Sequence, residues 1–415
     1  MNNLIYKTLQ FNKLKTSNYC ALLTLLFIML PIFDAINGYL VVKGVIASAG
    51  LASPSQLGRL MVTALIFYIL VSKKLSILPV LFLLYLLTIE TFSALYHQSQ
   101  YGFSYGIVSA YKLGYLMLLT IILKHYTKTE EGINQLGIFL KYNLIIIASM
   151  LYFSTITGIG NSTYGFGFGT KSFFASGNGL GLYLGIGSLF LIGLRHHKLI
   201  HFSHRSLLYI VLSIALIGSK AALILCAINL LCLVMLSKYR TSFIVALSII
   251  VFIFLPTIID TLSVLFDVIF RRLNNSDNLI LYLGSGRIDY VTDAFDVFFQ
   301  GDPNPFRLLF GMGAYTSFQN PLFVREFDTL ETDFFDLLFM YGLLSVISFL
   351  GIIGVVLFKL RKYKVLFLGM LLLSLHSIIA GHVLFNGMSS VCFALFICVA
   401  SFLSKKRRLN DKVAT

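Results

Sequence analysis

Apolar segments follow one another along most of this chain, and short polar turns separate them. At roughly 17 to 25 residues, each is long enough to cross a bilayer core of about 30 Å as a helix. A membrane β-barrel would instead alternate apolar and polar residues over segments of about ten. The pattern therefore predicts an all-α polytopic membrane protein with about 12 transmembrane helices. The expected spans are residues 19–37, 59–72, 75–95, 105–123, 135–157, 173–194, 206–218, 221–236, 241–260, 334–358, 365–384 and 388–404.

One long polar stretch interrupts these spans. Between Asp260 and Asp336 lie 12 of the chain's 17 acidic residues. Because charge is concentrated there, we interpret this stretch as a catalytic loop on one face of a membrane enzyme. The chain then divides into nine helices over 1–260, the loop over 261–333, three helices over 334–404 and a tail over 405–415.

The composition fits this class and excludes an ordinary soluble domain. Hydrophobic residues make up 58% of the 415 positions and charged residues 12%, whereas about a quarter of a soluble domain is charged. The net charge of +15 is explained by position, since 21 of the 32 lysines and arginines fall on one side when the loops alternate. Cations gather in cytoplasmic loops. We therefore expect both termini in the cytoplasm, loop 261–333 outside, and no nucleic-acid partner.

The cysteines and histidines do not predict a metal site. All five cysteines fall in apolar spans, without the C-x-x-C spacing of metal ligands, and we interpret them as small apolar residues. Four histidines lie between Arg195 and Arg205 at spacings that metal ligands also use. They fall on the cytoplasmic side, far from the acidic stretch, so we interpret them as part of a solvated basic loop. We expect no metal and no cofactor.

Three lysines on the outer side are candidates to bind an anion. Lys112 lies several residues inside its span, where an ionisable residue is a functional candidate, although its long stem can also snorkel to the surface. Lys171 ends the outer loop 158–172. Lys220 follows Gly218-Ser219 in a very short outer turn, where positive charge is otherwise scarce.

The stretch from 157 to 187 is rich in glycine. No βαβ unit surrounds these glycines, so a dinucleotide-binding loop is not indicated. We expect residues 158–172 to form a flexible outer loop. Gly177, Gly181 and Gly185 are spaced four apart on the next span, which favours close helix–helix packing. Asn178, at the outer end of that span, is a candidate to contact a substrate.

Residues 287–299 are predicted to form an amphipathic helix with Arg287 in its first turn. A cation there opposes the helix dipole, which is explained if Ser285, the guanidinium and backbone amides together bind an anion such as pyrophosphate. The alternative is an ion pair with a nearby carboxylate. Asp289 and Tyr290, two and three residues after Arg287, are candidates to contact a sugar.

Glu331, Asp333 and Asp336 stand where the chain re-enters the membrane. Acids in the first turn of a helix favour its dipole, with Thr332 as the N-cap. Alternatively, the apolar rim of the bilayer raises the pKa of one carboxyl so that it serves as a general base toward a hydroxyl. The sequence leaves both interpretations open.

The chain resembles the superfamily of O-antigen polymerases (Wzy-type) and O-antigen ligases. The resemblance covers the topology of nearly the whole chain and several short motifs. These motifs are Gly218-Ser219-Lys220, Gly284-Ser285-Gly286-Arg287, Leu309-Phe310-Gly311-Met312-Gly313, the segment Glu331-x-Asp333…Gly342, and Gly381-His382…Asn386. The resemblance implies a metal-independent glycosyltransferase of the C-type membrane architecture. Its implied donor is a glycan on undecaprenyl pyrophosphate, used on the periplasmic side of the bacterial inner membrane.

The ligase branch carries a histidine near the start of the span after the long loop, where this chain reads Glu331-Thr332-Asp333-Phe334-Phe335-Asp336. This departure favours a polymerase over a ligase. By analogy, Arg287 and Lys220 would hold the pyrophosphate, while one of the acids or His382 assists the attacking hydroxyl. A chain-length regulator is an expected partner. The remaining alternatives are a ligase that transfers glycan to lipid A-core and a transporter of lipid-linked sugars.

Overall fold

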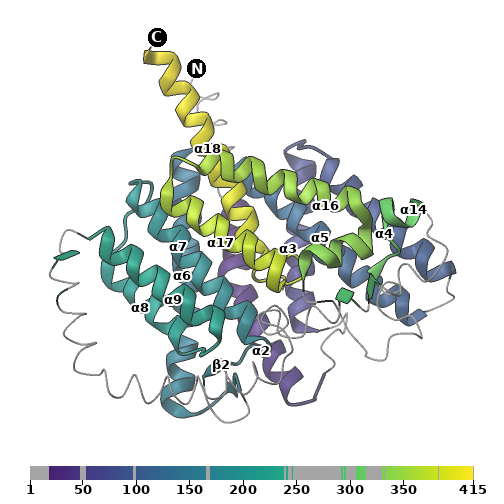
Figure 1. The fold of residues 1–415 in the computed structure, drawn as a ribbon, viewed down its shortest axis with the longest axis horizontal. Helices are drawn as coiled ribbons and strands as arrows, with labels where there is room; N and C mark the ends of the chain where they lie inside the picture. The colour runs from purple at the N-terminus through teal and green to yellow at the C-terminus, as the bar shows by residue number, and fades with distance from the viewer. Residues whose placement is uncertain are drawn as a thin grey trace, which may run out of the picture.

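The computed structural model describes residues 18–46, 53–96, 100–164, 169–237, 305–314, 332–381 and 383–414, with residues 240–241, 245, 291–292, 294–295 and 330. This part of the chain is almost entirely helical (Figure 1). Its elements are η1 (Leu25–Met29), α2 (Leu30–Val42), α3 (Pro54–Ser72), α4 (Leu78–Tyr96), α5 (Gln100–Tyr126), α6 (Glu130–Thr157), β1 (Asn161–Ser162), β2 (Thr170–Ser172), α7 (Gly177–His196), α8 (His204–Ala215), α9 (Lys220–Met235), α14 (Pro305–Phe310), α16 (Asp333–Leu360), α17 (Lys364–Ala380) and α18 (Ser390–Ala414).

The helices confirm an all-α membrane protein. Among the described residues, seven helices are long and apolar enough to cross a membrane, and three further apolar helices are shorter. The expected count of about 12 stays a prediction, because the expected span 241–260 lies almost wholly outside the described residues. Several boundaries differ from expectation. The first span was expected to end at residue 37, but its helix continues to Val42; α6 begins at Glu130 instead of 135, and α18 continues to Ala414 instead of ending at 404. A π-helical turn, η1, precedes Pro31 in the first of these helices.

Local sequence signals explain where several helices begin. Helices α3, α6, α7, α8 and α9 each follow a serine or threonine whose side-chain oxygen accepts a hydrogen bond from the amide three residues later. Such caps satisfy amides that have no partner within the helix. The capping residues are Ser53, Thr129, Ser176, Ser203 and Ser219.

Glycines let α7 pack closely against its neighbours, as the sequence predicts. A Cβ atom at Gly181 would lie 2.8 Å from the Cβ of Ala222, and one at Gly185 would lie 2.7 Å from the Cβ of Leu225. Both partners belong to α9, so small residues bring these two helix backbones together. The helix α7 is buried along most of its length.

The expectation of a flexible loop over 158–172 is wrong for its ends. Strands β1 and β2 pair antiparallel as a short hairpin. The Thr170 amide also donates to the carbonyl of Leu216, 2.8 Å away, which attaches the hairpin to the turn before α9. Backbone pairing of two- and three-residue strands leaves no hydrophobic alternation that a sequence reading can detect.

Helix α16 is broken at Gly342, where φ is 78° and ψ is 178°. The break removes the helical partners of two carbonyls, at Phe339 and Met340. These oxygens instead accept hydrogen bonds from the amides of Met312 and Gly313, at 3.2 and 3.0 Å. A broken helix inside a membrane protein requires such a replacement. Segment 309–314 therefore completes the backbone hydrogen bonding of α16.

The described helix ends fall into two groups. At one end, Tyr19 hydrogen-bonds His125 at 2.7 Å, Lys406 pairs with Glu130, and the His197 ring lies 4.8 Å from that of Tyr363. These contacts join the start of the first helix, at Tyr19, to the end of α5, the later part of α18 to the start of α6, and the end of α7 to the start of α17. We call this the basic end, because it carries Lys124, Lys128, Arg195, Lys198, Lys359, Arg361, Lys362 and Lys405.

The topology can be tested by cysteine labelling. We expect a cysteine at Asn178, which is exposed at the end opposite the basic end, to react with an impermeant thiol reagent in intact spheroplasts. A cysteine at Lys198 should react only after the membrane is opened. The background should lack the native cysteines, because Cys20 is exposed. Labelling of position 198 in sealed cells would invert the assignment of the two faces.

Candidate functional site

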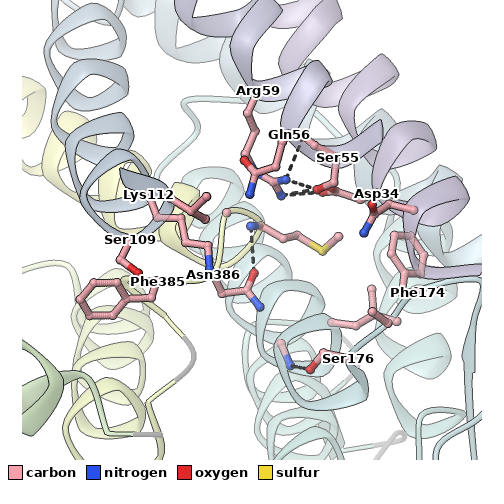
Figure 2. A pocket seen from close by; sticks show the side chains of 17 residues that line it. Asp34, Ser55, Gln56, Arg59, Ser109, Lys112, Phe174, Ser176, Phe385 and Asn386 are labelled. Atoms are coloured by element: carbon pink, nitrogen blue, oxygen red, sulfur yellow. Dashed lines mark hydrogen bonds and ion pairs between the residues drawn. The ribbon is translucent and has the colours of Figure 1, made fainter. Parts of the chain in front are cut away.

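A polar cavity of about 250 Å³ lies at the opposite end of the helix bundle. Four helices and one connecting segment meet there: α2, α3, α5, the start of α7, and residues 385–388 before α18. Figure 2 shows the labelled side chains converging on this space from these elements. The polar lining residues are Asp34, Asn37, Ser55, Gln56, Arg59, Ser109, Lys112, Ser176 and Asn386.

A buried ion pair forms one wall of the cavity. The Arg59 Nη2 atom lies 3.0 Å from Asp34 Oδ1, and the two side chains are only 8% and 9% exposed. Arg59 Nη1 also donates to the carbonyl of Ser55 at 3.0 Å, and the Ser55 hydroxyl donates to Asp34 Oδ1 at 2.5 Å. The dashed lines of Figure 2 mark this network. Ion pairs buried this deeply need such additional hydrogen bonds to offset desolvation.

One glycine makes room for the pair, and another lets α2 approach the segment before α7. A Cβ atom at Gly387 would lie 2.0 Å from Arg59 Nε, and one at Gly38 would lie 2.4 Å from the amide nitrogen of Ala175. Only glycine permits these close approaches. Arg59 Nε is buried and has no hydrogen-bond acceptor among the described residues. The guanidinium is thus held rigidly, with one donor unused by the residues around it.

The other wall carries a second cation and an amide. Lys112 comes from α5 and Asn386 from the segment before α18, and Figure 2 shows both near the cavity on the side away from Asp34. Asn386 Oδ1 accepts from the amide of Met388 at 3.0 Å. Among the described lining residues, the two cations Lys112 and Arg59 outnumber the carboxylates, of which there is one, Asp34. These residues make the cavity electropositive and suit an anionic ligand.

Asp333 holds the segment that lines the cavity. Its carboxylate is 1% exposed, and Oδ2 accepts hydrogen bonds from the Ser377 hydroxyl at 2.5 Å and from the amides of Val383 and Leu384 at 3.1 and 3.0 Å. Phe385 and Asn386 follow directly. Asp333 therefore ties the start of α16 to the chain between α17 and α18.

Asp336 is also buried, with 1% exposure, and its Oδ1 accepts from the Leu330 amide at 2.7 Å. The expected N-cap is not formed, since the Thr332 side chain makes no cap hydrogen bond. The backbone before α16 hydrogen-bonds Asp336 instead. The two carboxylates thus bond to backbone outside their own helix, which neither of the sequence interpretations anticipated.

Glu90 lies in the middle of α4 and is 1% exposed. Its two carboxylate oxygens lie 2.9 and 3.1 Å from the amide nitrogen of Ala314. A Cβ atom at Gly106 would lie 2.2 Å from Glu90 Oε2, and one at Gly313 would lie 2.9 Å away. Glu90 therefore fastens segment 309–314, the same segment that completes α16, against α4 and α5.

Six of the site residues predicted from the sequence lie among the described residues. Lys112 lines the cavity, and Asp333 positions its lining. Lys171 donates to the carbonyl of Ala175, a lining residue, at 2.9 Å. Asn178 is exposed between the cavity residues Ser176 and Gly179. Lys220 begins α9 and does not line the cavity, and Asp336 is buried beside Leu330.

The remaining candidates lie outside the described residues, namely Ser285, Arg287, Asp289, Tyr290, Glu331 and His382. Of the predicted helix 287–299, residues 291–292 and 294–295 are described and helical. Phe295 packs edge-on against Phe335 and Phe339, with ring centroids 5.8 and 5.2 Å apart. This contact places Phe295 against the first turns of α16.

Sequence reasoning missed three functional candidates, Asp34, Arg59 and Glu90. A signal existed for Glu90 and Asp34, because each is an ionisable residue within an apolar span. Arg59 stands at the border of its expected span, where a cation is ordinary. Its pairing with Asp34 depends on how α2 and α3 are rotated, which spacing along the chain does not reveal.

No protein-family model matches this chain, and no curated protein is significantly similar to it. Its apolar helices define it as an α-helical membrane protein. Anything finer about its activity rests on the cavity and on the motifs that surround it.

Proposed function

We propose that this protein is a membrane glycosyltransferase that polymerises oligosaccharide units linked to undecaprenyl pyrophosphate. It acts at the outer face of the bacterial inner membrane, with both termini in the cytoplasm, and builds O-antigen or a related surface polysaccharide. The observation that carries the proposal is the electropositive cavity at the end opposite the basic end, with Lys112 beside the buried Arg59–Asp34 pair. A pyrophosphate group carries negative charge, which complements this positive cavity.

The arrangement of the motif segments supports the proposal. A Cβ atom at Gly342 would lie 2.1 Å from the carbonyl oxygen of Leu309, so the segments 309–313 and 333–342 touch backbone to backbone. Asp333, in the second of these segments, bonds the amides of Val383 and Leu384 in a third. Three segments that carry the resemblance are therefore in contact, although more than 60 residues of sequence separate the first from the last.

A transporter of lipid-linked sugars is the second candidate. The buried Glu90 and the break of α16 at Gly342 favour it, because transporters place ionisable residues and broken helices at mid-membrane. Here, however, the break is closed by the amides of Met312 and Gly313, and Glu90 accepts from Ala314. The chain's own backbone occupies these groups, so we favour the enzyme.

Deletion of the protein in its native cell should separate these functions on a gel of surface glycolipid. Loss of a polymerase should leave acceptors that carry a single repeat unit, and we expect this result. Loss of a ligase would leave bare acceptors and long glycan on the lipid carrier. Loss of a transporter would leave bare acceptors with single units trapped inside, and either of these two patterns would refute the proposal.

Lys112 offers a test of the cavity itself. We expect Lys112→Met to reduce polymer formation at least about tenfold, because it removes a charge-assisted contact to phosphate while keeping the length of the side chain. Lys112→Arg should retain most of the activity. The measurement is glycan length on gels, with membrane levels of each variant matched.

Lys171→Met is the control, because the Lys171 ammonium group bonds the Ala175 carbonyl and the side chain does not line the cavity. It should change polymer formation less than Lys112→Met. Normal polymer from Lys112→Met would show that Lys112 only snorkels to the surface.

A further inference from the structure

A crevice runs along α16 toward the basic end, away from the polar cavity. Its part near the basic end has a volume of about 370 Å³ and is lined by α5, α16 and α18. It shares Ser348, Ile352 and Ile397 with an apolar cavity of about 280 Å³ nearer the middle of the bundle. The two spaces therefore adjoin along α16, and we call them together the groove. From Leu344 to Lys359, the α16 wall of this groove is about 22 Å long at 1.5 Å per residue.

The groove changes character along its length. Its middle is walled by apolar side chains, among them Phe349, Ile352 and Phe393. At the basic end it finishes between Lys124 of α5 and Lys359 of α16, with Ser401 of α18 beside them. Among the described residues, no carboxylate lines either part of the groove.

The two lysines are not neutralised by the described residues around them. Neither makes an ion pair in the described part of the chain. The nearby carboxylate Glu130 pairs with Lys406 instead, and Glu131 accepts from Gln135 at 3.3 Å. Two cations thus face an open crevice with an apolar floor.

The space in front of Gly351 is open. A Cβ atom at Gly351 would meet nothing within 4 Å, and Gly351 lines the crevice. The groove length exceeds half of a bilayer core of about 30 Å, which is the depth of one leaflet. A lipid chain therefore fits along it with its phosphate at the level of the lysines.

We propose that this groove binds an anionic phospholipid of the leaflet at the basic end. The phosphate lies between Lys124 and Lys359, and one acyl chain lies along Ile352, Val355 and Ile397. Charge complementarity selects this occupant, since basic sites between membrane helices attract anionic headgroups. The undecaprenyl carrier of the proposed function would have its phosphates at the opposite end, where the polar cavity lies.

The test is the affinity of the purified protein in neutral detergent for phosphatidylglycerol and phosphatidylcholine, measured by native mass spectrometry. We expect phosphatidylglycerol to bind more tightly. Lys124→Ala and Lys359→Ala should each weaken its binding about fivefold, and the double variant about 25-fold. Binding of phosphatidylcholine should hardly change in these variants.

Gly351→Leu fills the crevice and should also weaken phosphatidylglycerol binding. Gly354→Leu is its matched control, because a Cβ there also meets nothing within 4 Å and Gly354 does not line the crevice. Should Gly351→Leu fail to accumulate, the lysine variants carry the test alone. Because the groove is separate from the polar cavity, the polymer assay and this binding assay can fail independently.

Three results would overturn the proposal. Equal affinity for the two phospholipids would remove the role of charge. Displacement of phosphatidylglycerol by inorganic phosphate would show a site for a soluble anion. Undecaprenyl phosphate that binds more tightly than phosphatidylglycerol, and that binds more weakly to Gly351→Leu, would assign the groove to the carrier lipid.

Discussion

Arg59→Met should lower the free energy of unfolding by about 3–5 kcal/mol, because it leaves the Asp34 carboxylate buried without its guanidinium. The side chains of the pair are only 8% and 9% exposed, so the carboxylate left behind would be poorly solvated. We expect the variant to lose polymer formation as well. The measurement is the thermal unfolding midpoint of the purified protein in detergent, together with glycan length in cells.

The double variant Asp34→Leu/Arg59→Met separates stability from function. Replacing both members of a buried pair with apolar residues is often neutral or stabilising, so its unfolding midpoint should return close to that of the native chain. Polymer formation should stay lost, because the cavity has then lost its buried cation. An active double variant would show that the pair serves folding alone, and an unchanged midpoint in Arg59→Met would show that it does not stabilise the fold.

Substitution of Asp333 should lower both stability and activity, because this carboxylate accepts several hydrogen bonds. Asp333→Ala removes the acceptor of three hydrogen bonds and should cost about 3 kcal/mol or more in stability, at roughly 1–3 kcal/mol for each donor left unsatisfied. Polymer formation should be abolished, because residues 385–388 are no longer held at the cavity. Ser377→Ala is the control, since it removes only one of the three donors and should cost about 1 kcal/mol.

Asp333→Asn distinguishes a positioning role of this residue from a role as general base. Its amide oxygen can still accept from the amides of Val383 and Leu384, but it cannot serve as a general base. We expect the variant to keep measurable polymer formation, as a positioning residue would. Loss of all polymer from a variant with native stability would make Asp333 the base instead.

The fold was largely predictable from hydropathy. Runs such as those of α6 and α7 are apolar over the length of a bilayer, and serine or threonine caps mark several starts, as at Thr129 and Ser219. The glycine spacing of α7 also predicted close helix–helix packing, although not that the partner is α9. These features are local, so they can be read from neighbouring residues in the sequence.

The site was predictable only in part, since it is built from contacts distant in sequence. Lys112 could be recognised because a lysine inside an apolar span needs an explanation. The pairing of Asp34 with Arg59 depends on helix rotation, and that of Glu90 with Ala314 spans 224 residues. The break at Gly342 has no sequence signal of its own, because glycine is frequent in membrane helices.

The break in α16 also makes this helix dependent on segments made before it. The carbonyls of Phe339 and Met340 cannot be satisfied by their own helix, and their donors lie in segment 309–314, which leaves the ribosome earlier. Segment 309–314 is in turn fastened by Glu90 of α4, which is made earlier still. The start of α16 in turn needs later residues, since Asp333 accepts from Ser377, Val383 and Leu384. We therefore expect α16 to reach its final hydrogen bonding only after residues 377–384 have been made, and a chain truncated before α16 to leave the amides of Met312 and Gly313 without these acceptors.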